Sequence, residues 1–306
     1  MSKRKHRPSR PLWHPAFWPA WLGVFLLKQL SRLSMPAKQR WGKAIGQFLS
    51  RRWKSRHEVA LTNIRACFPQ YSEAEQQQLV EDCFVACVRG LLESTHAWWR
   101  DMTPFIETVE VHGLENLQEA KARGNGLLLI GAHYSIFDFA LPLIASRLNK
   151  PGYMYRPNNN PVIDRMIERG RRRHFNIQPF TKRQLPDMMD YLKQGGEVWY
   201  ACDQDFGRKV EVFAPFFGVE AGCITTPSHI ARESGASVIC VSHLRTPDGG
   251  YQVVFSPIQE NFGADDRKDA ETWNRFIETT IRQYPDQYLW LHKRFKTRPE
   301  GAPRFY

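Results

Sequence analysis

The chain of 306 residues has no low-complexity tract and no pair of cysteines at the spacing of a zinc site. Its six cysteines are scattered, and we expect them to be reduced, buried side chains of a cytoplasmic compartment. The length leaves room for one large α/β domain and a smaller appendage.

Acidic residues are few compared with basic ones: 31 Asp and Glu against 43 Lys and Arg, for a formal net charge of +12. This excess predicts an anionic partner, which is nucleic acid, an anionic membrane, or an acidic substrate or protein. The ten tryptophans favour the membrane, because indoles prefer the bilayer interface. Aromatic residues lie mainly in helical or apolar contexts and not on a basic strand face, which argues against nucleic acid.

The most apolar segment, residues 15–27, is short for a membrane-spanning helix. It follows a basic leader, residues 1–10, as in a signal peptide, but no small-residue cleavage site comes after it. Two interpretations stay open: an interfacial anchor, or a transmembrane helix extended toward Leu33 by snorkelling of Lys28. We expect attachment to the inner face of a membrane; the alternative is a buried helix of a soluble protein.

Three regions are expected: a membrane anchor (1–35), a helical membrane-associated region (36–104) and an α/β catalytic domain (105–306). In the second region, Trp41 and Phe48 belong to a set of apolar residues at helical spacing between arginines and lysines. That pattern suits either a helix on an anionic surface or an ordinary solvated face.

A long helix with a Ser72/Glu75 capping box is expected to run toward Trp99. After residue 104, short apolar runs alternate with helical segments, which predicts an α/β fold with a mixed central sheet and flanking helices. The expected strands are residues 106–113, 127–130, 152–156, 197–202, 238–244 and 251–255. The expected helices are residues 114–123, 162–174, 185–194, 225–234 and 269–284. Residues 213–218 are expected to form an apolar loop that lines a chain-binding groove or belongs to the core.

His133 lies in a turn between a buried strand and an apolar helix, and Asp138 follows five positions later. Such a turn lies at the carboxyl edge of a sheet, where α/β proteins place their chemistry. There a carboxylate can hold one imidazole nitrogen while the other acts as a general base. The spacing alone is weak, because His96 and His243 also precede an Asp by five positions, in less suitable contexts. The alternative for His133 is a purely structural, hydrogen-bonded histidine.

Arg156 ends the next expected strand, beside a loop that contains Asn158 and Asn160. A guanidinium at a strand end beside amides is well placed to bind a phosphate or a carboxylate. The helix after this loop is dense in arginine, and we expect most of these side chains to form a solvated basic face. One or two of them are candidates to meet an anionic headgroup.

Asp203, Gln204 and Asp205 follow a buried strand and precede a glycine turn at Gly207. Two carboxylates there suit a metal site, an acid/base pair, or an anchor for neighbouring loops. No His or Cys at ligand spacing joins them, so no metal is predicted, and an anchor or a substrate contact is favoured.

Several long blocks of the sequence together resemble one family, the lipid A late acyltransferases of Gram-negative bacteria. The resemblance is to the lauroyl/palmitoleoyl branch, which acts on Kdo2-lipid IVA. The blocks are Leu12-Trp-His-Pro-Ala-Phe-Trp, Asn63-Ile-Arg-Ala-Cys-Phe-Pro, Gly131-Ala-His-Tyr, Tyr155-Arg-Pro-Asn-Asn-Asn-Pro, Trp199-Tyr-Ala-Cys-Asp-Gln-Asp-Phe-Gly and Leu291-His-Lys-Arg-Phe-Lys-Thr-Arg-Pro-Glu-Gly.

The resemblance implies a glycerolipid-acyltransferase-like fold and places the family's His-x4-Asp/Glu (HXXXXD) signature on His133 and Asp138. Many relatives carry Glu at the second position, and Asp has a shorter reach. By analogy, His133 removes a proton from a hydroxyl of a hydroxyacyl chain as the oxygen attacks an acyl thioester, and Asp138 fixes the imidazole tautomer. Backbone N–H groups of the following helix, with Arg156, are expected to hold the oxyanion. No cofactor is needed besides the donor, acyl carrier protein loaded with an acyl chain.

The partners that the resemblance implies are acyl carrier protein, Kdo2-lipid IVA and the anionic inner membrane, with the catalytic domain on the cytoplasmic face and no nucleic acid. The pathway would be lipid A (lipopolysaccharide) biosynthesis. Alternatives are an acyltransferase acting on glycerol phosphate, a lysophospholipid or another glycolipid such as a mannoside. A further alternative is a non-enzymatic, basic peripheral membrane protein.

Overall fold

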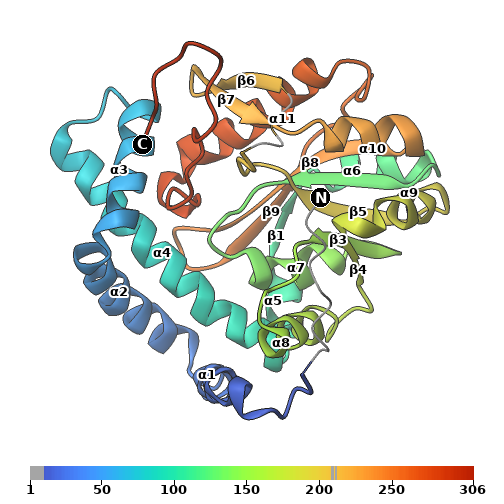
Figure 1. Ribbon diagram of the computed structural model, residues 1–306. Helices are drawn as coiled ribbons and strands as arrows, with labels where there is room; N and C mark the ends of the chain where they lie inside the picture. The colour runs from blue at the N-terminus through green and yellow to red at the C-terminus, as the bar shows by residue number, and fades with distance from the viewer. Residues whose placement is uncertain (1–9, 208–209, 211) are drawn as a thin grey trace.

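The computed structural model describes residues 10–207, 210 and 212–306 (Figure 1). Its N-terminal third is helical, and the long helix α4 runs past the sheet with α2 and α3 outside it (Figure 1). These elements are η1 (Pro15–Phe17), α1 (Trp18–Leu30), α2 (Met35–Arg52), α3 (Lys54–Cys67) and α4 (Glu73–Trp99). The expected capping box at Ser72 and Glu75 is present and starts α4.

After α4, the described chain forms, besides a small two-stranded hairpin, a seven-stranded sheet in the order β1-β9-β8-β2-β5-β3-β4, flanked by helices. All neighbouring strands are parallel except β8 and β9, so the predicted mixed sheet is confirmed. The strands are β1 (Glu110–His112), β2 (Leu127–Gly131), β3 (Pro151–Tyr155), β4 (Gln178–Thr181), β5 (Glu197–Ala201), β8 (Ser237–Arg245) and β9 (Tyr251–Phe255). The helices are α5 (Thr103–Thr108), α6 (Leu114–Ala122), α7 (Phe137–Ala145), α8 (Pro161–Arg171), α9 (Leu185–Lys193), α10 (Thr226–Ser234) and α11 (Asp266–Gln283), with η2 (Lys182–Gln184) and η3 (Pro285–Gln287) as short 3₁₀ turns.

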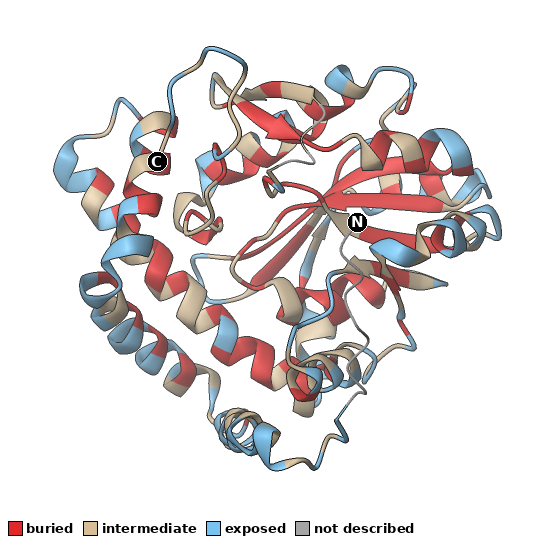
Figure 2. Cartoon of the chain, in the orientation of Figure 1, coloured by how far each residue is buried: buried red, intermediate tan, exposed pale blue. Residues whose placement is uncertain are grey.

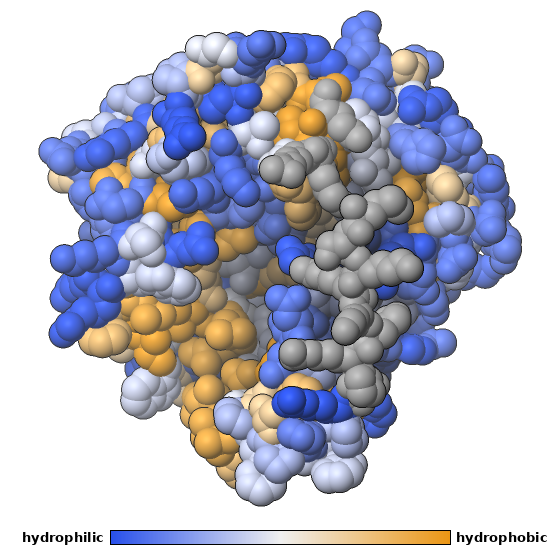
Figure 3. Space-filling model, in the orientation of Figure 1, coloured by the Kyte–Doolittle hydropathy of each residue, from blue (hydrophilic) through white to orange (hydrophobic). Residues whose placement is uncertain are grey.

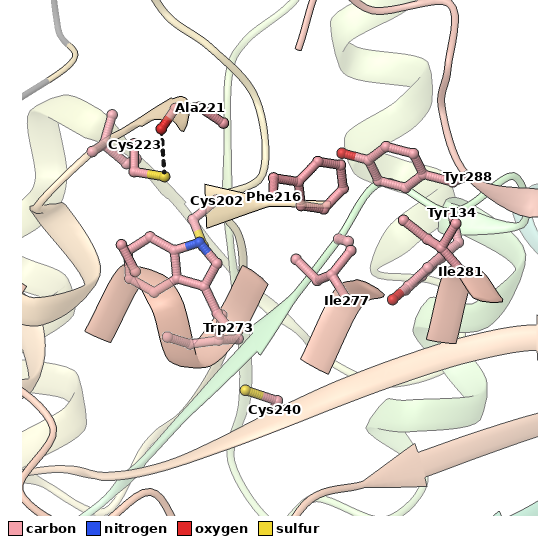
Figure 4. Close-up of a cluster of buried hydrophobic side chains, with 14 of the residues drawn as sticks. Tyr134, Cys202, Phe216, Ala221, Cys223, Cys240, Trp273, Ile277, Ile281 and Tyr288 are labelled. Carbon is pink, nitrogen blue, oxygen red and sulfur yellow. Dashed lines mark hydrogen bonds between the residues drawn. The ribbon is translucent and has the colours of Figure 1, made fainter. Parts of the chain in front are cut away.

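Strand β2 lies in the middle of the sheet and is buried on both faces (Figure 2). Because side chains alternate along a strand, Leu128 and Ile130 join one core layer while Leu127 and Leu129 join the other. The first layer includes three side chains of α11 (Figure 4). These are Trp273, Ile277 and Ile281. All six cysteines are free; five are buried and Cys87 is partly buried.

Two predicted segments differ from the structure. The expected strand 106–113 is a short helix, α5, followed by the three-residue strand β1. Asp101 accepts a hydrogen bond from the backbone of Thr103, and a proline occupies the first turn, so the local sequence starts a helix. The expected loop 213–218 is a hairpin of β6 (Val212–Phe216) and β7 (Val219–Cys223). Its two turn residues both have positive φ, as a tight two-residue hairpin turn requires.

Helix α2 packs on α4 through small residues and leaves its aromatic residues outside. Gly42, Gly46 and Ser50 are buried, and a Cβ on Gly46 would lie 2.5 Å from the Cα of Val85. On the outer face, Trp41 and Phe48 are 55% and 58% exposed. Apart from Lys38, the buried residues of α2 are therefore small, and its aromatic side chains face solvent.

Helix α1 has no buried residue. Its carboxyl end is held by Lys38, whose buried Nζ donates hydrogen bonds to the carbonyl oxygens of Ser31 and Leu33. Burial lowers the pKa of Lys38 to about 8. Within residues 10–207 and 212–306, no helix has both the length and the hydropathy needed to cross a membrane.

Helix α4 is joined to the turn that contains His133. Gly90 lies against Ser135, and a Cβ at Gly90 would lie 1.8 Å from the Ser135 carbonyl oxygen. Beside this contact, Arg245 forms a buried ion pair with Glu93 (2.8 Å) and donates to the Ser135 hydroxyl (3.0 Å). Glu93 also pairs with Arg89 (2.7 Å), so its buried carboxylate is fully compensated.

We predict that Gly90→Ala lowers the free energy of unfolding by about 2 kcal/mol or more, because the added methyl group must displace backbone atoms. Denaturant unfolding of the purified protein measures this. Gly23→Ala is the matched control, since nothing lies within 4 Å of its Cβ position in α1. It is expected to leave stability unchanged or raise it by up to about 1 kcal/mol. Equal stability of the Gly90→Ala variant and the wild type would show that α4 does not press on this turn.

Candidate active site

The sheet brings His133 and Asp203 together. Strands β2 and β5 are parallel neighbours in which Gly131 pairs with Ala201. His133 and Asp203 each come two residues after their member of this pair, so they leave the same edge of the sheet side by side. A Cβ on Gly131 would lie 2.4 Å from the indole nitrogen of Trp199, so this position needs glycine for β2 to lie next to that ring.

Asp203 holds His133 through two hydrogen bonds. The Nδ1 atom of His133 lies 2.6 Å from Oδ1 of Asp203, and the His133 backbone N–H donates to Oδ2 at 3.2 Å. The Asp203 side chain is 2% exposed, whereas that of His133 is 25% exposed. Since the carboxylate accepts, Nδ1 carries a proton, and in the neutral form of the ring Nε2 keeps its lone pair. Among the described residues no hydrogen bond engages Nε2, which is therefore free to act as a base.

The pKa of Asp203 reflects opposing effects. Burial alone raises it, but the charge of His133, the two hydrogen bonds from His133 and the more distant Arg294 together lower the pKa to about 2. The group is therefore ionised at neutral pH. The stability that it adds is present above its unfolded pKa of about 4 and is lost as the pH falls toward 2.

Aromatic rings surround the imidazole of His133. Phe137 stacks on it, with centroids 5.1 Å apart and ring planes 7° apart, and Trp199 stacks on Phe137 at 4.4 Å. His243 meets both Phe137 and Trp199 edge-on, and neither of its ring nitrogens has a hydrogen-bond partner among the described residues. Burial, with the nearby charge of His133, lowers the pKa of His243 to about 3, so this ring is neutral.

Asp138 does not hold His133 in this structure, which corrects the contact expected from the sequence. It lies in the first turn of α7 and pairs with Nε of Arg171 at the end of α8. The Arg171 guanidinium also lies over the rings of Phe137 (5.5 Å) and Tyr153 (5.0 Å). Helix α7 turns the Asp138 side chain toward α8, while β5 supplies Asp203 to the imidazole. Asp138 thus fixes the position of α7 relative to α8.

Asp205 joins the loop after β5 to the C-terminal segment. Its carboxylate accepts hydrogen bonds from the backbone of Gly207 (2.7 Å) and from the backbone and hydroxyl of Thr297 (2.5 and 2.8 Å). Its own N–H donates to Nε2 of His292 at 3.1 Å. Burial lowers the pKa of His292 to about 4, which keeps that nitrogen an acceptor. The geometry of Asp205 is that of a loop anchor.

The remaining candidates lie around α8 and in the loop after β5. Asn160 caps α8, since its side-chain oxygen accepts from the backbone of Val162 at 3.0 Å, and Asn158 accepts from the backbone of Asn160 at 2.9 Å. Arg156 is exposed, and no described contact joins it to His133. Gln204 is partly exposed between the two aspartates.

Sequence reasoning missed Arg171, His243 and Tyr288 as parts of the site. Tyr288 lies close enough to Asp203 for the charge of that carboxylate, after burial, to raise the tyrosine pKa. These three residues come from a helix, a strand and the C-terminal segment, and no short motif joins them to His133. In the described part of the chain, no group of three or more His, Cys, Asp or Glu side chains is arranged to hold a metal ion.

A partly exposed histidine held by a buried carboxylate, with one ring nitrogen free, can accept a proton from a hydroxyl and return it to a leaving group. The fold and site therefore define the class: an α/β protein with a histidine–carboxylate pair at the carboxyl edge of a mostly parallel sheet.

Comparison with known proteins gives the family. Residues 6–297 match the family model described as bacterial lipid A biosynthesis acyltransferase. The chain is 36% identical to the lipid A biosynthesis lauroyltransferase of Escherichia coli K12, over 97% of this chain and 98% of the relative. It is 33% identical to the palmitoleoyltransferase of the same organism, over 97% of both, and 26% identical to its myristoyltransferase, over 96% and 91%. The protein belongs to the lipid A biosynthesis acyltransferase family and is an acyltransferase.

We predict that His243 makes the fold less stable in mild acid. The unfolded chain takes up a proton near pH 6.5, but folded His243, with a pKa of about 3, does not. From pH 7 to pH 5 this residue therefore lowers the free energy of unfolding by about 2 kcal/mol, and His243→Phe removes that decrease. Denaturant unfolding at both pH values measures it. His112→Gln, at an exposed position, is the control, and an identical pH dependence in the Phe variant and the wild type would contradict the prediction.

Proposed function

We propose that the protein transfers an acyl chain from acyl carrier protein to a hydroxyl of a hydroxyacyl chain on Kdo2-lipid IVA, a late step of lipid A biosynthesis. The observation that carries the proposal is the pairing of His133 with Asp203, which leaves Nε2 as a free base in a family of lipid A acyltransferases. The late acyl groups named for the relatives, lauroyl and palmitoleoyl, support a fatty-acyl donor.

The chemistry follows from this geometry. Nε2 of His133 takes the proton of the acceptor hydroxyl as its oxygen bonds to the carbonyl carbon of the thioester. The tetrahedral intermediate then expels the thiolate of the donor, and the imidazolium returns the proton to that sulfur. The new bond is an oxygen ester, the broken bond is the thioester, and no cofactor takes part. General-base assistance of this kind contributes about 10²–10⁴ in rate.

The site can stabilise both charges that develop during the attack, on the imidazolium and on the oxyanion. Asp203 stays ionised down to a pH of about 2, so its negative charge stabilises the imidazolium formed during the attack. The oxyanion forms beside the first turn of α7, where backbone N–H groups have no intrahelical partners. Asp138 and Arg171 are positioning residues: their ion pair fixes the first turn of α7 against α8.

We propose that α1 and α2 bind the cytoplasmic face of the inner membrane. The outer face of this region carries large exposed apolar side chains, which Figure 3 shows as orange patches at the lower left. Arginines such as Arg51 and Arg52 border them. Aromatic rings with flanking cations are the side chains that an anionic bilayer interface accommodates best. The remaining basic surface suits acyl carrier protein, an acidic partner.

The test of the reaction supplies purified protein with Kdo2-lipid IVA and a mixture of C10 to C16 acyl carrier protein thioesters, with mass spectrometry of the product. The wild type is expected to add one acyl chain, and His133→Ala to lower kcat by about 10²–10⁴. Acylation of lysophosphatidate but not of Kdo2-lipid IVA would instead assign the enzyme to phospholipid synthesis. Full transfer by His133→Ala would exclude it as the base.

In the same assay, the pH dependence of kcat/KM distinguishes the roles of Asp203 and Asp138. Asp203→Asn removes the charge beside the imidazolium, so the acid limb of kcat/KM moves to lower pH. Asp138→Asn leaves that limb in place and instead lowers the free energy of unfolding by about 3 kcal/mol, since Arg171 loses its buried partner. A shifted limb in Asp138→Asn would show that the sequence-based pairing operates in the active enzyme.

The membrane surface is tested by sedimentation with vesicles that contain phosphatidylglycerol. Trp41→Ser combined with Phe48→Ser is expected to weaken binding at least tenfold, because two exposed rings leave the interface. Leu114→Ser removes an exposed apolar side chain from α6, which lies away from α2 (Figure 1), and is the control. Unchanged binding of the α2 variant would place the membrane contact elsewhere.

A further inference from the structure

A cavity of about 610 Å³ lies between α1, α4 and α8. None of the described residues around it belongs to the His133–Asp203 pair. One wall is formed by α1 through Trp21 and Phe25, which are 42% and 56% exposed, and another by Trp98 and Trp99 at the end of α4. The cavity therefore opens beside the exposed apolar surface of α1.

The wall formed by α8 is cationic. Arg165, Arg169 and Arg173 border the cavity, and Lys28 faces them from α1. No acidic residue is found among the described residues of the lining. Arg171, by contrast, pairs with Asp138, and Arg172 with Glu168. The three lining arginines have no ion pair within the described part of the chain and are exposed, so their charge is available to a ligand.

The spacing of these arginines sets the kind of ligand. Arg165, Arg169 and Arg173 recur every four residues and so lie on one side of α8 and its C-terminal extension. Successive guanidinium groups start about 6 Å apart along the axis, and the row spans about 12 Å. A single phosphate is too small to reach all three. A headgroup with several anionic groups spread over that length matches the row, and apolar rings at the other wall suit its hydrocarbon chains.

Helix α8 also connects this cavity to the active site. Gly170 lets α8 approach α4, since a Cβ there would lie 2.4 Å from Cδ1 of Trp98. The next residue, Arg171, pairs with Asp138 in the first turn of α7. The cationic row and the turn that contains His133 are thus fixed relative to each other by one rigid helix.

We propose that the cavity between α1, α4 and α8 binds the phosphorylated sugar headgroup of the acceptor glycolipid, with Arg165, Arg169 and Arg173 contacting its anionic groups. The inference rests on the proposed function, because it takes the acceptor to be the polyanionic glycolipid of that reaction. It assigns these arginines to acceptor binding and not to the chemical step.

The test is the triple variant Arg165→Gln/Arg169→Gln/Arg173→Gln, assayed with Kdo2-lipid IVA and with the same acceptor after enzymatic removal of its phosphates. With the phosphorylated acceptor the triple variant is expected to raise KM about tenfold or more and to change kcat less than threefold. With the dephosphorylated acceptor the KM of the wild type is already raised, and the triple variant adds little, since the two changes remove the same contacts.

The matched control is Arg183→Gln/Lys193→Gln/Arg275→Gln, which removes the same charge from exposed positions outside the cavity. It is expected to leave both KM values unchanged, and thermal unfolding verifies that each variant is folded. An unchanged KM in the cavity variant, or an equal rise for both acceptors, would overturn the proposal. So would weaker sedimentation with phosphatidylglycerol vesicles at an unchanged KM, which would make the cavity a site for bulk phospholipid.

Failure of the proposed function gives a different result, because the wild type then adds no acyl chain to Kdo2-lipid IVA. In that case, equilibrium binding of the glycolipid in detergent micelles tests whether the cavity binds its headgroup. Binding at least tenfold weaker for the cavity variant than for the wild type and the control supports a headgroup site. Equal binding by all three proteins contradicts it.

Discussion

The structure of the active site depends on the hydrogen bonds between His133 and Asp203 across two parallel strands. A carboxylate that is 2% exposed is costly to bury, and the imidazole and backbone N–H of His133 are its direct compensation. The pairing requires the register of β2 and β5, in which Gly131 lies opposite Ala201. A shift by one residue would turn one of the two side chains to the other face of the sheet.

The elements around this pair limit its movement from several sides. Helix α4 presses on the turn at Ser135 through Gly90, and the buried Arg245–Glu93 pair closes the same contact. Helix α7 is fixed to α8 by Asp138 and Arg171. At the same edge of the sheet, Asp205 joins the loop after β5 to Thr297. The imidazole of His133 is thereby held in one orientation, which is the condition for efficient proton transfer in the reaction that we propose.

The outer surface of α1 and α2 exposes large apolar side chains, which elsewhere are mostly buried in the core. Helix α2 places small residues inward and aromatic residues outward, and α1 buries none of its residues. An exposed apolar face of this kind is unfavourable in water and is typical of a surface that binds an apolar partner. Basic residues surround it, and the cavity beside α1 combines the same two properties at smaller scale. A lipid bilayer and an anionic glycolipid both combine apolar chains with charged headgroups. The membrane contact and the acceptor site that we propose therefore need the same kind of surface.

The sequence by itself determined the mixed sheet, the capping box of α4, the position of His133 after a buried strand and the family. These features depend on local periodicity, on residues a few positions apart and on blocks that resemble known proteins. The partner of His133 was assigned wrongly, because Asp138 is close in sequence whereas Asp203 is 70 residues away and is brought near only by strand pairing. The role of Arg171 was missed for the same reason, since Arg171 and Asp138 are 33 residues apart. The hairpin at residues 212–223 is local, and it was missed because its two-residue turn was not recognised. Local structure depends on neighbouring residues and can be predicted from them. Which carboxylate contacts which histidine depends on the order and register of the strands, and the packing of the whole chain determines both.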